Sequence, residues 1–144
     1  MKIEKIDRVV FAVKSVKEAA NFLEKTLGIK FDEHVDAKDL NIRVKYSSLG
    51  IQLNEGTTPE SDVNKFLNRH GEGFYCLALK VPDIEEAKKE LISKGVRHLR
   101  DFQVGQLKES VFNPKDSHGM MIVLVEYPTY HGATVAALEY GPKS

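Results

Sequence analysis

The sequence has very little cysteine, with Cys76 as the only one in 144 residues. A single thiol cannot form a disulfide within the chain, and this usage is typical of a reducing compartment, so we expect a cytoplasmic protein. The longest apolar run, from Met120 to Val125, is too short to span a bilayer. The N-terminal segment MKIEKID also lacks the apolar stretch of a signal peptide.

The chain also lacks an excess of charge of either sign. Lys and Arg number 21, Asp and Glu number 21, and the formal net charge at pH 7 is zero. Because no basic field would attract nucleic acid or anionic lipid, we expect neither nucleic acid nor membrane as a partner. Apolar residues make up 42% and charged residues 29%, which is typical of a globular domain, and the length suffices for one core.

Three segments carry helix start or stop signals. SVKEAANFLEKTLG (15–28) begins with a Ser that is followed three residues later by a Glu, and it ends with a Gly. DIEEAKKELISKG (83–95) repeats this design with Asp and Glu. A third helix is predicted over 59–70, with Pro59 in its first turn. The remaining apolar, β-branched runs predict eight strands, at 5–13, 29–36, 41–48, 50–55, 73–81, 96–102, 108–113 and 119–126.

The two halves of the chain have the same order of predicted elements. RVVFAVKSVKEA falls on CLALKVPDIEEA when the chain is shifted by 68 residues, which places Arg8 on Cys76. IQLNE falls on IVLVE when the shift is 71 residues, which places Gln52 on Val123. Each half predicts a strand, a helix and three further strands, and we interpret this as an internal duplication.

The duplication predicts an α+β fold. Two tandem βαβββ modules, at about 5–56 and 72–126, would form a cupped mixed sheet with the helices outside. The helix at 59–70 would join them, so that residues 1–126 form one domain. The C-terminal extension 127–144 contains several aromatic and apolar residues, and we expect it to dock on the domain or on a second subunit.

A duplicated module of this kind resembles the vicinal-oxygen-chelate superfamily of glyoxalases, bleomycin resistance proteins and extradiol dioxygenases. KFLNRHGEGFYCLALKVPDIEEAKKELISKGVR (65–97) is very similar to methylmalonyl-CoA epimerases. NPKDSHGMMIVLVE (113–126) resembles the last turn and strand of those enzymes, and it is nearly as similar to 4-hydroxyphenylpyruvate dioxygenases. The resemblance implies a glyoxalase fold, a small anionic or acyl-CoA-type ligand in a central cleft, and a homodimer.

The resemblance also implies a divalent metal, such as Co, Mn, Zn or Ni, with ligands at the positions of Arg8, Gln52, Cys76 and Val123. The family has His at the first and third of these positions and Glu at the fourth, whereas Gln52 is a ligand type that the epimerases use. Arg has no lone pair to donate, and Val has no donor atom. Gln52 and Cys76 alone are too few for a catalytic site, so we expect no metal and no other cofactor.

Three of these residues are candidates for ligand binding. Arg8 either reaches solvent or pairs with Asp7 or another acid, or its guanidinium takes the metal position and binds a carboxylate or thioester oxygen. Cys76 is interpreted as a small buried hydrophobe rather than a nucleophile. Gln52 either lies in the cleft or faces water.

Asp39 is the candidate catalytic residue. It lies in DAKDLNIRV, close to where the epimerases place a second acid before their third strand, with Glu33 and Asp36 as nearby alternatives. In one interpretation the protein is an isomerase, epimerase or lyase without a metal, in which Arg8 polarises a carbonyl and Asp39 moves the proton. In the alternative it is a non-catalytic binding module, and in a third it is a metal-dependent lyase, isomerase or dioxygenase with atypical ligands.

Overall fold

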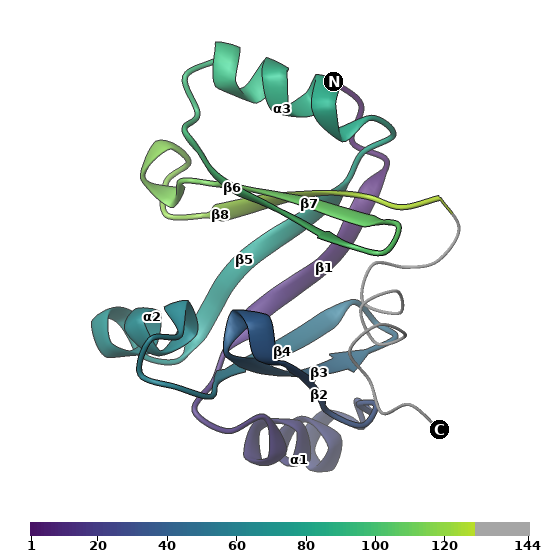
Figure 1. Cartoon of the computed structure of the whole chain (residues 1–144). Helices are drawn as coiled ribbons and strands as arrows, with labels where there is room; N and C mark the ends of the chain where they lie inside the picture. The colour runs from purple at the N-terminus through teal and green to yellow at the C-terminus, as the bar shows by residue number, and fades with distance from the viewer. Residues whose placement is uncertain (129–144) are drawn as a thin grey trace. The chain divides into compact units, whose positions relative to one another are not determined.

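The computed structural model describes residues 1–128, and within them the fold is α+β, as predicted (Figure 1). The strands are hydrogen-bonded in the order β2-β3-β4-β1-β5-β8-β7-β6. The sheet is mixed, since β5 and β8 are parallel and the pairs β2–β3, β3–β4, β6–β7 and β7–β8 are antiparallel. The elements are β1 (Lys5–Ala12), α1 (Val16–Leu27), β2 (Val35–Ala37), η1 (Lys38–Leu40), β3 (Ile42–Ser47), β4 (Ile51–Gly56), α2 (Asp62–His70), β5 (Gly73–Lys80), α3 (Ile84–Ser93), β6 (His98–Val104), β7 (Leu107–Phe112), η2 (Pro114–Asp116) and β8 (Met121–Glu126).

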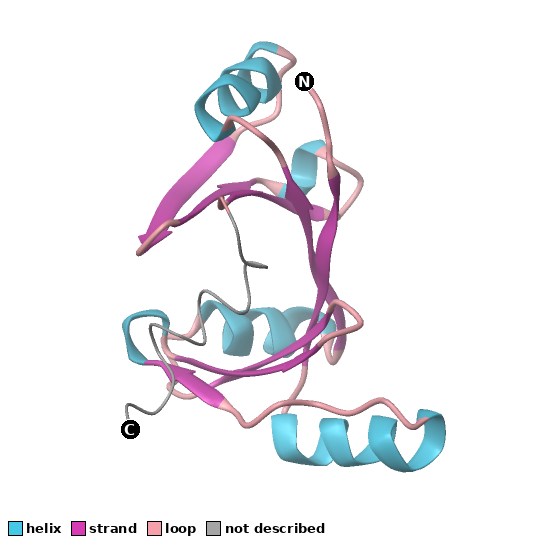
Figure 2. Cartoon of the chain, turned by 90° about the vertical axis from the view of Figure 1, so that its right-hand side faces the viewer, coloured by secondary structure: helices cyan, strands magenta, loops and turns pink. Residues whose placement is uncertain are grey.

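The described residues form two compact units. Unit 1 comprises Met1–Val9 and the described residues from Cys76 onward, and unit 2 comprises Val10–Tyr75. The strands β1 and β5 therefore contribute residues to both units. In unit 1, α3 packs on β7 and β8, and in unit 2, α1 packs on β3 and β4 (Figures 1 and 2).

The two units use the same contacts to join a helix start to the last strand of its module. In each, the backbone N–H at the end of the first strand donates to a carbonyl of the last strand, and a glutamate of that strand accepts from the first helical N–H. These contacts are Val13 N to Asn54 O (2.9 Å), Val81 N to Val125 O (2.9 Å), Val16 N to Glu55 Oε1 (2.8 Å) and Ile84 N to Glu126 Oε1 (2.9 Å). The residue pairs are those that the shifts of the sequence place together, which supports the interpretation as a duplication.

Each unit has a core between its helix and one face of its strands. In unit 1, Leu124 and Phe112 pack with Ile84 of α3, so Val123, next to Leu124 on β8, faces away from this helix. In unit 2, Leu53 packs with Val16 of α1. In each unit this helix covers one face of the strands and does not cover the opposite face.

Two predicted elements are wrong in their bounds. The strand predicted over 29–36 is β2, which spans only Val35–Ala37, because the preceding residues are mostly charged and exposed and bond to β3 through a single backbone contact, Asp32 N to Tyr46 O (2.9 Å). The helix predicted over 59–70 begins at Asp62, because the hydroxyl of Ser61 caps it by accepting from Val63 N (3.2 Å). Apart from Tyr127 and Pro128, the predicted extension 127–144 lies outside the described residues.

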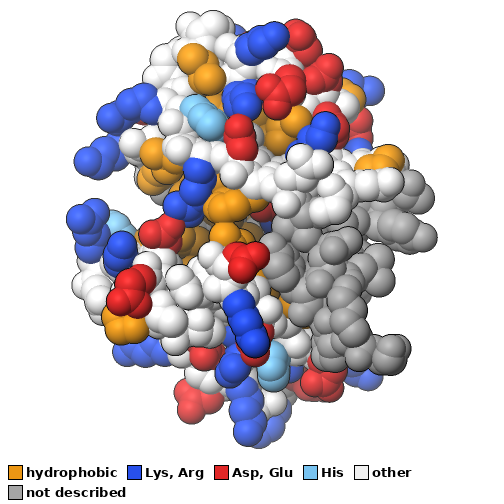
Figure 3. All heavy atoms as spheres, in the orientation of Figure 1, with side chains coloured by type: hydrophobic (Ala, Val, Ile, Leu, Met, Phe, Trp, Pro, Cys, Tyr) orange, Lys and Arg blue, Asp and Glu red, His pale blue; other side chains and the backbone are white. Residues whose placement is uncertain are grey.

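The surface carries charges of both signs, as the balanced composition predicts. Lys and Arg side chains are interspersed with Asp and Glu side chains on the face drawn in Figure 3. Of the helices in the described part of the chain, none is long and apolar enough to cross a membrane.

Candidate functional site

The face of unit 1 that lies away from α3 carries three of the four positions implied for metal ligands. Val123 faces away from α3, and in the parallel register it pairs with Ala78, two residues after Cys76 on β5. Val111 of β7 pairs with Val123, and Glu109 pairs with Val125, so Glu109 lies on this face as well. Arg8 reaches the face from β1, which is hydrogen-bonded to β5.

Arg8 is buried, and two carboxylates hold its guanidinium. Its side chain is 8% exposed, and Nη1 donates to Asp7 Oδ2 at 2.6 Å. Nη2 donates to Glu109 Oε1 in a short contact across 101 residues of sequence. The other oxygen of Asp7 accepts from the hydroxyl of Tyr127 at 2.6 Å. These four residues, Tyr127, Asp7, Arg8 and Glu109, form a continuous chain of hydrogen bonds, which we call the Arg8 cluster.

The cluster keeps Arg8 charged. Burial disfavours the guanidinium charge, but Glu109 and Asp7 outweigh it and raise the pKa of Arg8 above its usual value. Two carboxylates around one guanidinium give the cluster a formal charge of −1. Among the described residues, Nε of Arg8 is a buried donor without a hydrogen-bond partner. Arg8 therefore does pair with Asp7, as one interpretation of the sequence held, but it does not reach solvent.

Cys76 lies close enough to Arg8 to interact with its charge. Burial raises the pKa of the Cys76 thiol to about 12, although Arg8 acts in the opposite direction. The side chain is buried and the thiol stays protonated near neutral pH. It is therefore not a ready nucleophile.

The residues of this face do not fit a divalent metal. Arg8 is a cation that donates to carboxylates and Val123 has no donor atom, so Cys76 alone of the three implied positions on this face could donate to a metal. Within residues 1–128, no group of three or more His, Cys, Asp or Glu side chains could hold a metal ion. Of the four positions that the resemblance implies, only Gln52 and Cys76 carry a donor atom for a metal, which is fewer than a catalytic site requires.

The other two candidate residues belong to unit 2. Gln52 is 8% exposed, so it does not face water, and its Nε2 donates to Asn54 Oδ1 at 2.8 Å. Asp39 is exposed on η1, where no hydrogen bond or ion pair joins it to another described residue. Of its predicted alternatives, Asp36 is bound by Arg43 Nε at 2.8 Å, which lowers the pKa of Asp36, and Glu33 is exposed.

Two members of the cluster were missed by the sequence reasoning. Tyr127 falls in the predicted extension 127–144, and the sequence patterns above do not identify Glu109. A signal for Glu109 exists, because it alternates with Leu107 and Val111 on the buried side of β7. A charged residue in such a position requires a partner of opposite charge.

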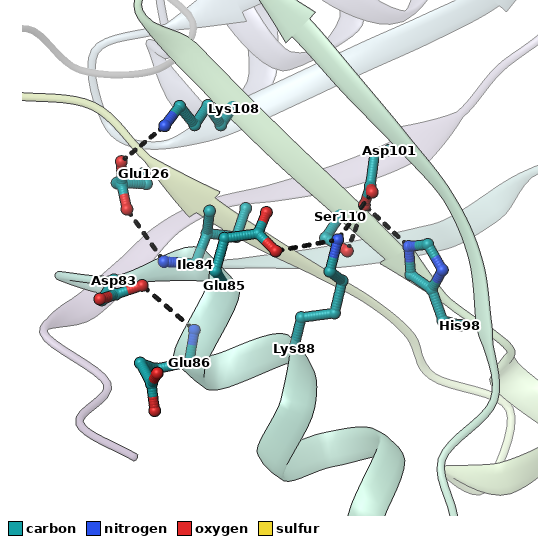
Figure 4. Close-up of polar contacts among 10 residues, drawn as sticks. All are labelled: Asp83, Ile84, Glu85, Glu86, Lys88, His98, Asp101, Lys108, Ser110 and Glu126. Carbon is teal, nitrogen blue, oxygen red and sulfur yellow. Dashed lines mark hydrogen bonds and ion pairs between the residues drawn. The ribbon is translucent and has the colours of Figure 1, made fainter.

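A second polar cluster lies on the helix side of unit 1 (Figure 4). Asp101 of β6 accepts from Lys88 Nζ of α3 at 2.8 Å and from Ser110 Oγ at 2.7 Å, and it lies 2.7 Å from His98 Nε2. Burial opposes ionisation of Asp101, but these hydrogen bonds outweigh it and lower its pKa to about 2. The cluster ties α3 to β6 and β7.

Comparisons with known proteins agree with this architecture. The chain is 28% identical over 130 residues to the uncharacterised protein YqjC of Bacillus subtilis (strain 168), covering 86% of this chain and 93% of the relative. It is 25% identical over 130 residues to the mitochondrial methylmalonyl-CoA epimerase of Mus musculus, covering 85% of this chain and 73% of the relative.

A solved structure of a Streptomyces coelicolor methylmalonyl-CoA epimerase variant, in complex with 2-nitronate-propionyl-CoA, has a TM-score of 0.78 and 26% identity. The alignment covers 89% of this chain and 100% of that one. The sequence model of one protein family matches residues 7–111, which is most of the described chain. With this match and the fold, the chain belongs to the glyoxalase/bleomycin resistance protein/dioxygenase superfamily.

Proposed function

We propose that this protein binds an acyl-CoA-type thioester at the face of unit 1 that carries the Arg8 cluster, and that it does so without a divalent metal. The observation that carries the proposal is the state of Arg8, whose guanidinium is buried and held by Asp7 and Glu109. A fixed cation of this kind replaces a metal ligand with a hydrogen-bond donor. The site can then hold an oxygen of a ligand but cannot chelate an ion.

The class of ligand is supported by the relatives. The Streptomyces coelicolor structure contains 2-nitronate-propionyl-CoA, and another methylmalonyl-CoA epimerase structure, with a TM-score of 0.79 and 25% identity, contains methylmalonyl-CoA and NH4+. A thioester carbonyl is a hydrogen-bond acceptor, so it suits a site whose central group is a donor.

Binding alone is the simpler function for these residues. Proton transfer needs a base within hydrogen-bond reach of the ligand. Among residues 1–128, this face offers only Glu109, which is already bound by Arg8. Asp39, the candidate proton carrier, is exposed in unit 2. Epimerisation or another isomerase reaction is therefore the alternative that an assay must address.

Isothermal titration calorimetry tests the proposal. Propionyl-CoA should bind the protein in the presence of EDTA and bind more tightly than free CoA, because only the thioester supplies the carbonyl oxygen. Binding that disappears with EDTA and returns with Co²⁺ or Mn²⁺ would contradict the proposal, as would equal affinity for CoA and propionyl-CoA. Deuterium exchange at the α-carbon, followed by NMR in D₂O, would reveal the isomerase alternative.

The quaternary state belongs to the same proposal. The resemblance implies a homodimer, which light scattering of the full chain measures directly. The cytoplasm is the location that the cysteine usage indicates.

A further inference from the structure

Glu109 is the part of the Arg8 cluster that a ligand would meet first. Its side chain is 18% exposed, whereas that of Asp7 is fully buried and also held by Tyr127. Asp7 and Arg8 are neighbours on β1, so their pairing is local to one strand. Glu109 comes from β7, and its carboxylate completes the pairing of the guanidinium. The charge that a ligand experiences at this site is therefore set by Glu109.

The two carboxylates of the cluster already neutralise the positive charge with which Arg8 would attract an anion. With Asp7 and Glu109 both paired to it, the formal charge of the three side chains is −1. A carboxylate brought to within a few ångströms would be repelled by this excess, and the low exposure of the groups limits screening by solvent. A neutral oxygen acceptor is not subject to this repulsion.

The guanidinium nevertheless retains a donor. Nε of Arg8 has no hydrogen-bond partner in the described part of the chain and is buried. Nε and Nη2 form one edge of the guanidinium fork, and Glu109 bonds only to Nη2. A buried donor without an acceptor is unfavourable, so a ligand oxygen that reaches it is favoured. The charge and the donor together select a neutral carbonyl.

We propose that Glu109 is a specificity-determining residue that makes the Arg8 site select neutral acyl thioesters and reject acyl groups bearing a carboxylate. This inference rests on the proposed function and narrows its ligand class. The expected ligand carries an uncharged acyl chain, whose thioester carbonyl accepts from Arg8 Nε, and the repelled ligand carries a free carboxylate beside that carbonyl.

Propionyl-CoA and methylmalonyl-CoA are a matched pair of probes, because the second is the first with a carboxylate added at the α-carbon. We expect the protein to bind propionyl-CoA about tenfold more tightly than methylmalonyl-CoA. This factor lies between the repulsion that Coulomb's law gives for two charges in a water-like dielectric and in a protein-like dielectric. In Glu109→Gln, which keeps the size and the acceptor oxygen, the affinity for methylmalonyl-CoA should rise about tenfold. The affinity for propionyl-CoA should change much less.

The control variant removes a carboxylate of unit 1 that lies outside the Arg8 cluster. Asp116 pairs with Arg97 on the surface, and Asp116→Asn changes the net charge by the same amount as Glu109→Gln. It should leave the ratio of the two affinities unchanged. Circular dichroism confirms that both variants are folded.

The outcomes separate this inference from the proposed function. If both thioesters bind equally, or if Glu109→Gln leaves the ratio unchanged, Glu109 does not set specificity, although thioester binding stands. If Asp116→Asn changes the ratio as much as Glu109→Gln, the effect is one of net charge and the inference is wrong. If neither thioester binds, the proposed function fails and this inference fails with it.

Discussion

Replacing Arg8 by Met should be among the most destabilising single substitutions in this protein. Met fills a similar volume but leaves two carboxylates, Asp7 and Glu109, without their cation. The side chain of Asp7 has no solvent exposure, so water cannot replace the lost partner. The cost comes mainly from the carboxylate charges that lose their buried cation rather than from the lost contact itself.

Breaking a buried ion pair in this way costs about 3–5 kcal/mol. With a slope of about 2 kcal/mol per molar urea, the unfolding midpoint should fall by about 2 M. Removing all three charges should cost less than removing only the cation. The triple variant Asp7→Asn, Arg8→Met and Glu109→Gln should therefore recover at least about half of the loss, because no unpaired charge remains.

Urea denaturation followed by circular dichroism measures these differences. Arg97→Met is the matched control, because Arg97 also pairs with a carboxylate, Asp116, but its side chain is 60% exposed. Its midpoint should stay within the error of the unsubstituted protein. If Arg8→Met does not fold, the triple variant should still give a cooperative transition.

If Arg8→Met shifts the midpoint no more than Arg97→Met does, the buried carboxylates do not depend on Arg8 and this prediction is wrong. It is also refuted if the triple variant is less stable than Arg8→Met, because the carboxylates would then not be the source of the cost.

Three further predictions concern other parts of unit 1. The thiol of Cys76, with its pKa raised to about 12, should react with a thiol reagent at pH 8 more than about a hundredfold faster in urea than in the native protein. Because the folded pKa of Asp101 is about 2, below an unfolded value of about 3.9, its contribution to stability should be present above pH 5 and be lost as the pH falls through 4 to 2. Comparison of Asp101→Asn with the unsubstituted protein should show a difference in unfolding midpoint that vanishes over that range. Glu126→Gln should cost about 0.5–1 kcal/mol in urea denaturation, because Gln can still accept from Ile84 N but lacks the negative charge that favours the start of α3.

Much of the fold could be predicted from the sequence because it is encoded twice. The caps Ser15 and Asp83 accept from the N–H groups of Glu18 and Glu86, as their spacing predicts. The same shifts that align the sequence also align the contacts at the helix starts. The predicted bounds 29–36 were wrong because the duplicated pattern does not determine the length of this strand. The first residues of that range are mostly charged and exposed.

The site was less predictable, because its decisive contact is non-local. Arg8 and Cys76 could be placed together from the duplication and the resemblance, and the structure does place them in one unit. The partner Glu109 is 101 residues from Arg8, and its approach depends on the register of β7 with β8. Local patterns fix which face a residue occupies but not which residue of another strand it meets.

The resemblance to metal-dependent enzymes and the charge pairs of this chain favour different functions, and our proposal follows the charge pairs. A resemblance locates positions, but whether a metal binds depends on the donor atoms at those positions. Here one position is a cation and one is apolar, which leaves only Gln52 and Cys76 with a donor atom. A guanidinium on a buried face needs carboxylates as much as a divalent ion would, so the presence of Glu109 does not indicate a metal site. The cation that Glu109 contacts in this structure is Arg8.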